Sequence, residues 1–175
     1  MSSRDLVPLV AVGILLTAAD LEADTVTIVS NRDNTLYENA LGLTSNGAGK
    51  HFFAGRNAVG ENRRGVIRFP VEDSLPLGAP VTSVTLTLHM SKTIAPPVPV
   101  NLHRLVKDWG EGASDADFEE GGGAASEPGD ATWLHTFYDT IPSQAMFWTT
   151  PGGDFYPTFS ASRMVDSLVG FYTWS

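Results

Sequence analysis

Four histidines have the broadest chemical repertoire in this chain, namely His51, His89, His103 and His135. His89 and His103 occupy polar positions of two segments, 83–90 and 100–106, in which apolar and polar residues alternate. The proline-rich stretch 93–99 separates these segments, so we expect an antiparallel hairpin with both histidines nearly opposite each other on its polar face. Two imidazoles could begin a metal site, but the sequence supplies no evident third ligand. We therefore expect two half-exposed histidines of a sheet.

Carboxylates suited to glycoside hydrolysis come closest together at Asp108 and Glu111, which flank Trp109. Such a reaction needs two carboxyl groups across the scissile bond. The alternative, which we favour, is that Trp109 packs over the edge of a sheet while its neighbours fix the turn. The sequence contains no G-x-S-x-G, no H-E-x-x-H, no phosphate-binding loop and no dinucleotide fingerprint. We therefore expect a protein without enzymatic activity.

A second group of acids lies between residues 111 and 130, where Asp115, Asp117 and Glu119 alternate. Oxygen ligands at the first, third and fifth positions resemble a calcium-binding loop, although the sixth residue is Glu120 where glycine is expected. Calcium held by these three carboxylates is one interpretation, and an ordinary solvated acidic segment is the favoured one. No other cofactor is expected.

The composition limits the classes of partner. The chain has 175 residues, of which 42% are hydrophobic and 18% charged, which suits one domain with a core. A formal net charge of -9 disfavours binding to nucleic acid or to an anionic membrane surface, since both require a basic face. The absence of cysteine excludes disulfides, thiolate metal sites and cysteine nucleophiles.

Residues 1–23 have the pattern of a secretory signal peptide. Arg4 stands in a short polar start, residues 6–19 are almost wholly apolar, and Ala19 and Ala23 offer small residues for cleavage. The apolar stretch is short for a bilayer span, and a buried N-terminal helix or strand is the alternative. We expect a secreted protein, extracellular or at the cell surface, whose domain begins at residue 24.

Short alternating or β-branched segments, separated by glycine and proline, predict an all-β fold. The expected strands are 25–30, 65–69, 83–90, 100–106, 131–138 and 169–174. Residues 111–130 are expected to form a long surface loop that contributes nothing to the core. No segment after residue 23 has a convincing helical period. We predict an antiparallel β-sandwich of jelly-roll type over 24–175.

Aromatic residues are concentrated in the C-terminal half, including Trp109, Trp133, Trp148 and Trp174. Exposed rings stack on the apolar faces of sugars, so these residues would suit a glycan-binding surface. The alternative, favoured for each ring taken singly, is burial in the core.

The expected glycan site is the polar face of segments 83–90 and 100–106, with His89 and His103 at its centre. The other predicted site residues, whose strands would have to lie alongside, are Arg56, Arg63 and Tyr37. The face carries no tryptophan or tyrosine, so a stacking ring must come from elsewhere. A basic, histidine-bearing patch on an acidic protein favours an anionic polysaccharide. A merely solvated face is the alternative.

Three arginines bracket the expected strand 65–69. Arg68 shares a face with Val66, so we expect it to be partly buried and paired with a carboxylate. Arg63 points the other way and is expected to be free to meet an acidic sugar.

Several stretches resemble, in order, the DNRLRE domain family of secreted bacterial proteins, which is related to carbohydrate-binding module family 96. The run Asp-Asn-Thr-Leu-Tyr-Glu at 33–38 is similar to the family's eponymous motif and differs from it at Thr35 and Tyr37. Further similar stretches are 46–49, 51–56, 63–69, 80–86, 100–112, 129–133 and 147–154. The resemblance implies an extracellular jelly-roll module without catalysis. Family domains usually continue past the point where this sequence ends, so we expect missing last strands and leave open an attached domain beyond residue 175.

The sequence thus predicts a secreted, non-catalytic module that binds carbohydrate or acts at the cell surface, with an anionic polysaccharide as the candidate partner. The alternative is a structural or adhesive envelope protein, or a subunit of an extracellular polymer, without a sugar site.

Overall fold

The computed structural model describes residues 24–118 and 120–175. Within these ranges the chain folds into short strands, one four-residue α-helix and one three-residue 3-10 helix. The strands are β1 (Arg32–Tyr37), β2 (Thr44–Ser45), β3 (Gly55–Arg56), β4 (Asn62–Arg68), β5 (Leu86–Met90), β6 (Val98–Leu102), β7 (Ala124–Ala125), β8 (His135–Phe137), β9 (Met146–Phe147), β10 (Ala161–Val165) and β11 (Gly170–Trp174). The helices are α1 (Val71–Ser74) and η1 (Glu120–Gly122). The all-β prediction is confirmed. The predicted leader lies outside the described residues.

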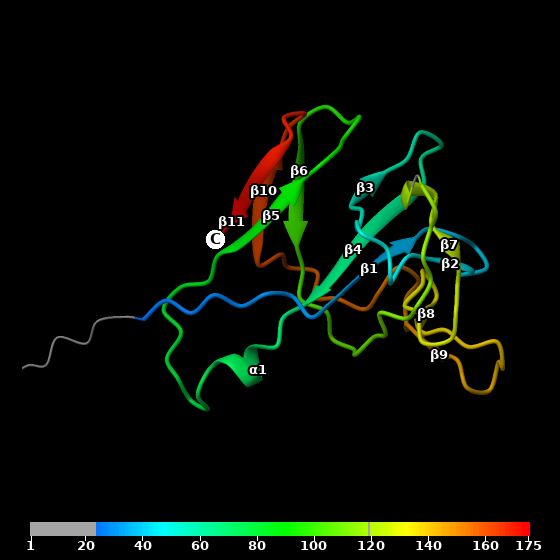
Figure 1. Cartoon of the computed structure of the whole chain (residues 1–175), viewed down its shortest axis with the longest axis horizontal. Helices are drawn as coiled ribbons and strands as arrows, with labels where there is room; N and C mark the ends of the chain where they lie inside the picture. The colour runs from blue at the N-terminus through cyan, green and yellow to red at the C-terminus, as the bar shows by residue number, and fades with distance from the viewer. Residues whose placement is uncertain (1–23, 119) are drawn as a thin grey trace, which may run out of the picture.

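The strands of the described residues form small antiparallel sheets. One has three strands in the order β1-β4-β3, and the others are the two-stranded ribbons β10-β6, β11-β5, β2-β7 and β8-β9. Figure 1 shows β5, β6, β10 and β11 grouped on one side and the remaining strands on the other. The jelly-roll arrangement stays a prediction, because no hydrogen-bonded sheet in residues 24–118 and 120–175 has more than three strands.

The main core lies against one face of β1 and β4. Leu36 and Val66 share this face, because the antiparallel register pairs residue 36 with 64 and residue 34 with 66. The residues that they pack against include Ala131, Trp109, Trp133 and Trp148. Trp174 is buried as well, with 5% of its surface exposed. The favoured interpretation of the tryptophans as core residues is therefore confirmed, and none of the four offers a flat ring to a sugar.

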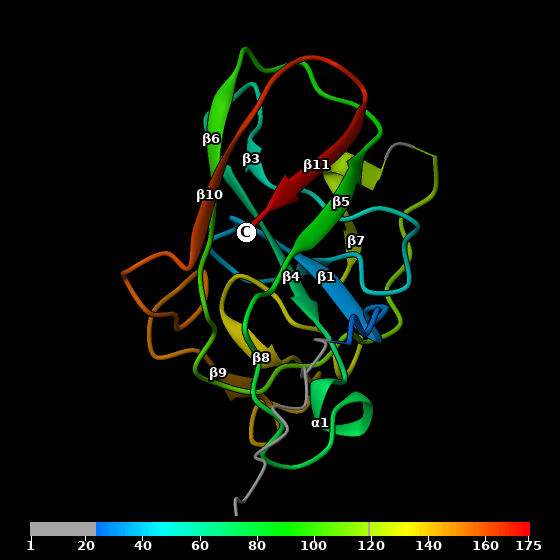
Figure 2. The same cartoon turned by 90° about the vertical axis from the view of Figure 1, so that its left-hand side faces the viewer.

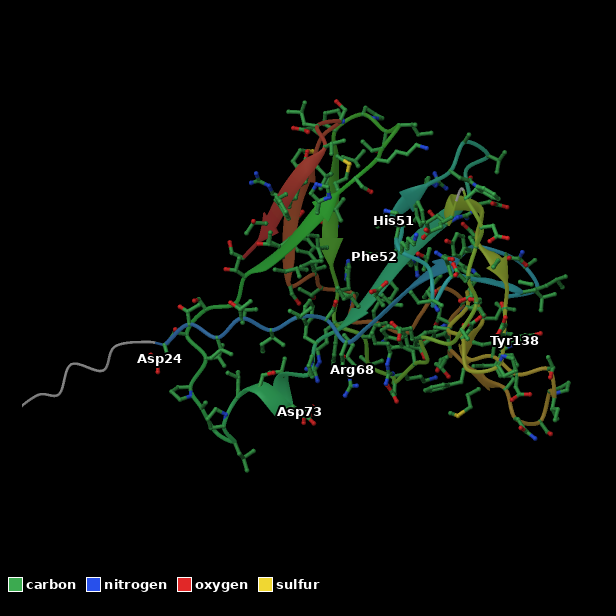
Figure 3. All side chains as sticks on the ribbon, viewed as in Figure 1. Asp24, His51, Phe52, Arg68, Asp73 and Tyr138 are labelled. Atoms are coloured by element: carbon green, nitrogen blue, oxygen red, sulfur yellow. The ribbon has the colours of Figure 1, made fainter. Side chains whose placement is uncertain are left out.

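The opposite face of this sheet is covered by the loop that carries His51 and Phe52 (Figure 3). A Cβ atom on Gly65 of β4 would lie 2.4 Å from the Phe52 ring, so the glycine makes room for it. Tyr37 of β1 is 1% exposed, and its hydroxyl donates a hydrogen bond to the carbonyl oxygen of Glu120 (2.7 Å). Burial raises the pKa of Tyr37 to about 12. Tyr37 therefore anchors η1 and is not a surface residue.

The segment 111–130 is a surface segment over much of its length, as its composition predicts, but it also contributes buried residues. Ser114, Ala116 and Asp130 are buried. Polar groups at the start of this segment are satisfied by hydrogen bonds from the core. The amide group of the fully buried Asn34 donates to the Glu111 carbonyl oxygen (2.8 Å). Asp130 accepts a hydrogen bond from the backbone N–H of Glu127 (2.7 Å), and burial outweighs such bonds and raises its pKa. Internal hydrogen bonds thus replace water around this segment.

The arginines of β4 are arranged differently from the prediction. Arg68 is exposed near the place where the two groups of strands meet (Figure 3), and no ion pair of its side chain is found within residues 24–118 and 120–175. Arg64 is the partly buried one: its guanidinium lies 4.9 Å from the Trp133 ring and 5.0 Å from the Phe155 ring. Burial lowers the pKa of Arg64. Side chains alternate along a strand, so Arg64 and Arg68 lie on the same face of β4. Arg68 is nevertheless exposed, because it is the last residue of the strand and lies beyond the core.

Two predicted β features are wrong. Residues 25–30 make no strand in this structure, and the first strand starts at Arg32. Segments 83–90 and 100–106 do not pair with each other, because β5 pairs with β11 and β6 pairs with β10. The connection 91–97 contains Pro96 and Pro97 and is too long for a tight turn, so each strand takes a partner from the C-terminal part of the chain. The alternation within β5 is confirmed, with Thr87 and His89 exposed.

Candidate functional site

The predicted glycan-binding residues do not form one patch. His89 lies on β5 and His103 follows β6, and these strands belong to different ribbons. Tyr37 and Arg63 are opposite each other in the β1–β4 register, in the sheet that also holds Arg56. Arg63 stands over the buried Tyr37 ring at 4.9 Å and pairs with Glu61 at 3.3 Å, and its side chain is 12% exposed. The prediction that Arg63 is free to meet a sugar is therefore wrong.

The outward face of the β5–β11 ribbon supplies the ring that the sequence-based site lacked. The register pairs His89 with Phe171 and Thr87 with Thr173, so these four side chains share one face. The His89 and Phe171 rings meet edge to face, with centroids 4.9 Å apart and planes inclined by 65°. The hydroxyl oxygens of Thr87 and Thr173 are 3.2 Å apart. Phe171 is 76% exposed, so its ring is available for stacking.

The inward face of the same ribbon is held firmly. Tyr172 and Trp174 are buried, and the Trp174 indole N–H donates to the Val100 carbonyl oxygen (2.9 Å). The Tyr172 hydroxyl lies 2.5 Å from a carboxylate oxygen of Asp166, and this hydrogen bond lowers the pKa of Asp166. Because β11 alternates, fixing Tyr172 and Trp174 inward turns Phe171 outward. Figure 2 shows β11 beside β5 on the side that faces the viewer.

Sequence reasoning missed Phe171 and Thr173. Both lie in the run 170–174, where phenylalanine, tyrosine and tryptophan fall on both faces, so alternation alone does not tell which face is buried. A usable signal was the match between the two strands. Thr87 and His89 alternate on one face of β5, and Thr173 and Phe171 alternate in the same way on β11, so the two strands can pair threonine with threonine and ring with ring.

The other predicted sites are less supported by the geometry. Asp115 and Asp117 are exposed, and Glu119 lies outside the described residues. Among the described residues, no group of three or more histidine or acidic side chains is arranged to hold a metal ion. Asp108 pairs with Arg32 at 3.0 Å, and Glu111 accepts a hydrogen bond from the Asp33 backbone N–H at 2.9 Å. Trp109 between them is buried, as in the favoured interpretation.

A separate surface hollow of about 380 Å³ lies where residues 106–107 meet 149–155. Lys107 crosses it, with its ammonium nitrogen 2.7 Å from an Asp154 carboxylate oxygen and 2.7 Å from the Thr149 hydroxyl. Burial alone would raise the pKa of Asp154, but hydrogen bonds from Lys107 and from the Thr149 and Thr150 N–H groups hold it well below its ordinary value. The ion pair therefore holds residues 149–154 against Lys107, and the pair carries no net charge.

No family model, no curated protein and no solved structure matches this chain. Within residues 24–118 and 120–175, no helix has the length and apolar character needed to cross a membrane.

Proposed function

We propose that this protein is a secreted, non-catalytic module that binds polysaccharide on the outward face of the β5–β11 ribbon. The observation that carries this proposal is the exposed Phe171 ring, which meets His89 edge to face on a regular strand. Among the aromatic residues of β11, Phe171 alone presents its ring to the solvent, so it is the ring of this strand that a ligand can reach. The C–H-rich face of a pyranose stacks on such a ring.

The groups around Phe171 suit the polar rim of a sugar. Thr87 and Thr173 present hydroxyls that both donate and accept hydrogen bonds, and the His89 ring adds a nitrogen of either role. Each of these groups lies on a strand, so its position is fixed by the ladder before a ligand arrives. This preorganisation favours binding of repeated units along an extended chain.

A second candidate function is that of a structural or adhesive protein. It is favoured by exposed apolar residues around the β10–β11 connection, where Met164 is 56%, Leu168 71% and Val169 63% exposed. Such a surface suits contact with another protein. Sedimentation of the purified protein separates the two functions: a monomer at about 100 μM that binds polysaccharide supports the module, and assembly without polysaccharide binding supports the structural protein.

The polysaccharide function is tested by gel electrophoresis of the purified protein through polyacrylamide that contains alginate, pectin, xylan or a soluble cellulose derivative. At least one polymer is expected to retard the protein. Phe171→Ala is expected to abolish retardation by xylan or the soluble cellulose derivative and to weaken retardation by the acidic polymers alginate and pectin. Phe118→Ala is the matched control, because Phe118 is fully exposed and makes no ring contact within the described residues. Equal retardation of both variants by every polymer would reject the Phe171 surface as the binding site. No retardation of the parent protein by any polymer would reject the function.

A further inference from the structure

Arg104 and Tyr156 form an exposed stacked pair beside the hollow. The Tyr156 backbone N–H donates to the Arg104 carbonyl oxygen (3.0 Å), which fixes the two residues opposite each other. The guanidinium carbon of Arg104 lies 5.4 Å from the centroid of the Tyr156 ring. Arg104 is exposed and Tyr156 is 50% exposed. The ring holds the guanidinium by a cation–π contact and leaves its N–H groups facing solvent.

Arg104 has no carboxylate partner among the described residues. Arg32, Arg63 and Lys107 are each paired with an acid, at 3.0, 3.3 and 2.7 Å respectively. A planar guanidinium with free N–H groups binds a carboxylate through two parallel hydrogen bonds, and this geometry is selective as well as strong. The aromatic support distinguishes Arg104 from Arg56, which is exposed on β3 without a ring beneath it.

The hollow continues this surface along the strand. The Val106 backbone N–H donates to the Asp154 carbonyl oxygen (3.0 Å), and the Leu105–Phe155 bridge lies between this pair and Arg104–Tyr156. Val106 projects on the same side as Arg104, because the two are separated by one residue in extended chain. Val106 and Thr150 both line the hollow. The Lys107–Asp154 pair is neutral as a unit, and Arg104 adds an exposed positive charge beside it. The other nearby cation, Arg64, is partly buried, with its guanidinium 5.0 Å from the Phe155 ring.

We propose that the Arg104–Tyr156 pair and the adjoining hollow bind the carboxylate of a uronic acid residue. Arg104 takes the carboxylate, the exposed part of the Tyr156 ring contacts the apolar face of the sugar, and the hollow accepts the neighbouring ring of the oligosaccharide. The volume of about 380 Å³ is adequate for a ring of this size. The inference deepens the proposed function by naming an acidic sugar, and it uses no residue of the Phe171 surface, so the two fail separately.

The test is calorimetric titration of the protein with trigalacturonate, with cellotriose as the neutral probe and triglutamate as the acidic peptide probe. Trigalacturonate is expected to bind at least tenfold more tightly than either of the other two. Arg104→Gln is expected to weaken trigalacturonate binding roughly tenfold and to remove most of its salt dependence. Tyr156→Leu is expected to weaken it roughly threefold. Arg56→Gln, the matched control, and Phe171→Ala are expected to leave it unchanged.

Three outcomes would overturn the inference. The first is the same loss of affinity in Arg104→Gln and Arg56→Gln, which indicates diffuse electrostatic attraction. The second is triglutamate binding as tightly as trigalacturonate, which indicates a site for acidic peptides. The third is no measurable binding of trigalacturonate at millimolar concentration by the parent protein. Circular dichroism of each variant verifies that a lost affinity is not a lost fold.

Discussion

The rings of His89 and Phe171 meet edge to face at 4.9 Å, across two strands that the chain brings together from distant parts of its sequence. The imidazole holds the phenyl ring upright on the outward face, since an edge-to-face pair is more favourable than two independent rings. The contact gives His89 a positioning role for the proposed stacking surface, in addition to any hydrogen bond that it makes to a sugar.

Replacing His89 therefore separates these two contributions. His89→Ala is expected to weaken polysaccharide binding about fivefold, because an aromatic pair contributes about 1 kcal/mol. His89→Phe keeps the edge-to-face contact and removes the ring nitrogens, so its loss of affinity measures the hydrogen bond alone. Affinity electrophoresis of both variants is the measurement. If His89→Ala binds as well as the parent, the imidazole has no part in the site.

Gly152 is expected to be irreplaceable for steric reasons. Its φ is +87°, and an added Cβ atom would lie 2.6 Å from the Arg64 guanidinium and 2.7 Å from the Trp133 ring. Gly152→Ala should lower the free energy of unfolding by about 3 kcal/mol, since left-handed strain and core displacement add together. Urea denaturation measures the change.

Gly78 provides the matched control, because its φ is +79° and nothing lies within 4 Å of an added Cβ atom. Gly78→Ala should lower the free energy of unfolding by only about 1 kcal/mol, from backbone strain alone. Equal losses in the two variants would show that the packing of Arg64 against Trp133 is unimportant.

The Lys107–Asp154 ion pair should make stability depend on pH. The folded-state pKa of Asp154 is below its unfolded value, so its stabilising contribution is present above the unfolded pKa near 4 and is lost as the pH falls toward the folded value. Asp154→Asn should lower the melting temperature clearly at pH 7 and less at pH 2.5, which lies between the unfolded and the folded pKa of Asp154. Asp108→Asn is the control, because the Asp108 side chain is 72% exposed and its pairing with Arg32 is screened by water. A constant effect of Asp154→Asn across this range would contradict the assignment.

Asn34 should be the most sensitive polar residue of the core. Its side chain is fully buried and hydrogen-bonds to Ser45 (2.9 Å), the Glu111 carbonyl oxygen (2.8 Å) and the backbone N–H of Asn46 (3.2 Å). Asn34→Ala leaves buried partners unsatisfied and should cost about 3 kcal/mol of unfolding free energy. Thermal unfolding followed by tryptophan fluorescence measures this. Asn101→Ala, at an exposed position of β6, should change it by less than about 1 kcal/mol.

The sequence was sufficient for features that depend on local pattern. The alternation of Thr87 and His89 with leucines predicts the faces of β5 correctly, and the all-β class follows from the same kind of pattern. Pairing was not predictable in this way, because β5 and β6 are consecutive in sequence yet each pairs with a distant strand. The burial of Ser114, Ala116 and Asp130 within 111–130 was not predicted, because a hydrophobicity pattern does not reveal hydrogen bonds such as the one from Asn34 to the Glu111 carbonyl oxygen. The candidate site was missed for the same reason: Phe171 becomes a neighbour of His89 only through long-range register.

The central claim is that polysaccharide lies on the outward face of β5 and β11. Titration of the isotope-labelled protein with an oligosaccharide of the polymer that retards it, followed by backbone and methyl NMR spectra, tests this residue by residue. The account predicts that the largest shift changes fall on Thr87, His89, Phe171 and Thr173, with little change in the buried residues Leu36 and Val66. Changes confined to other surfaces, with none at Phe171, would contradict it.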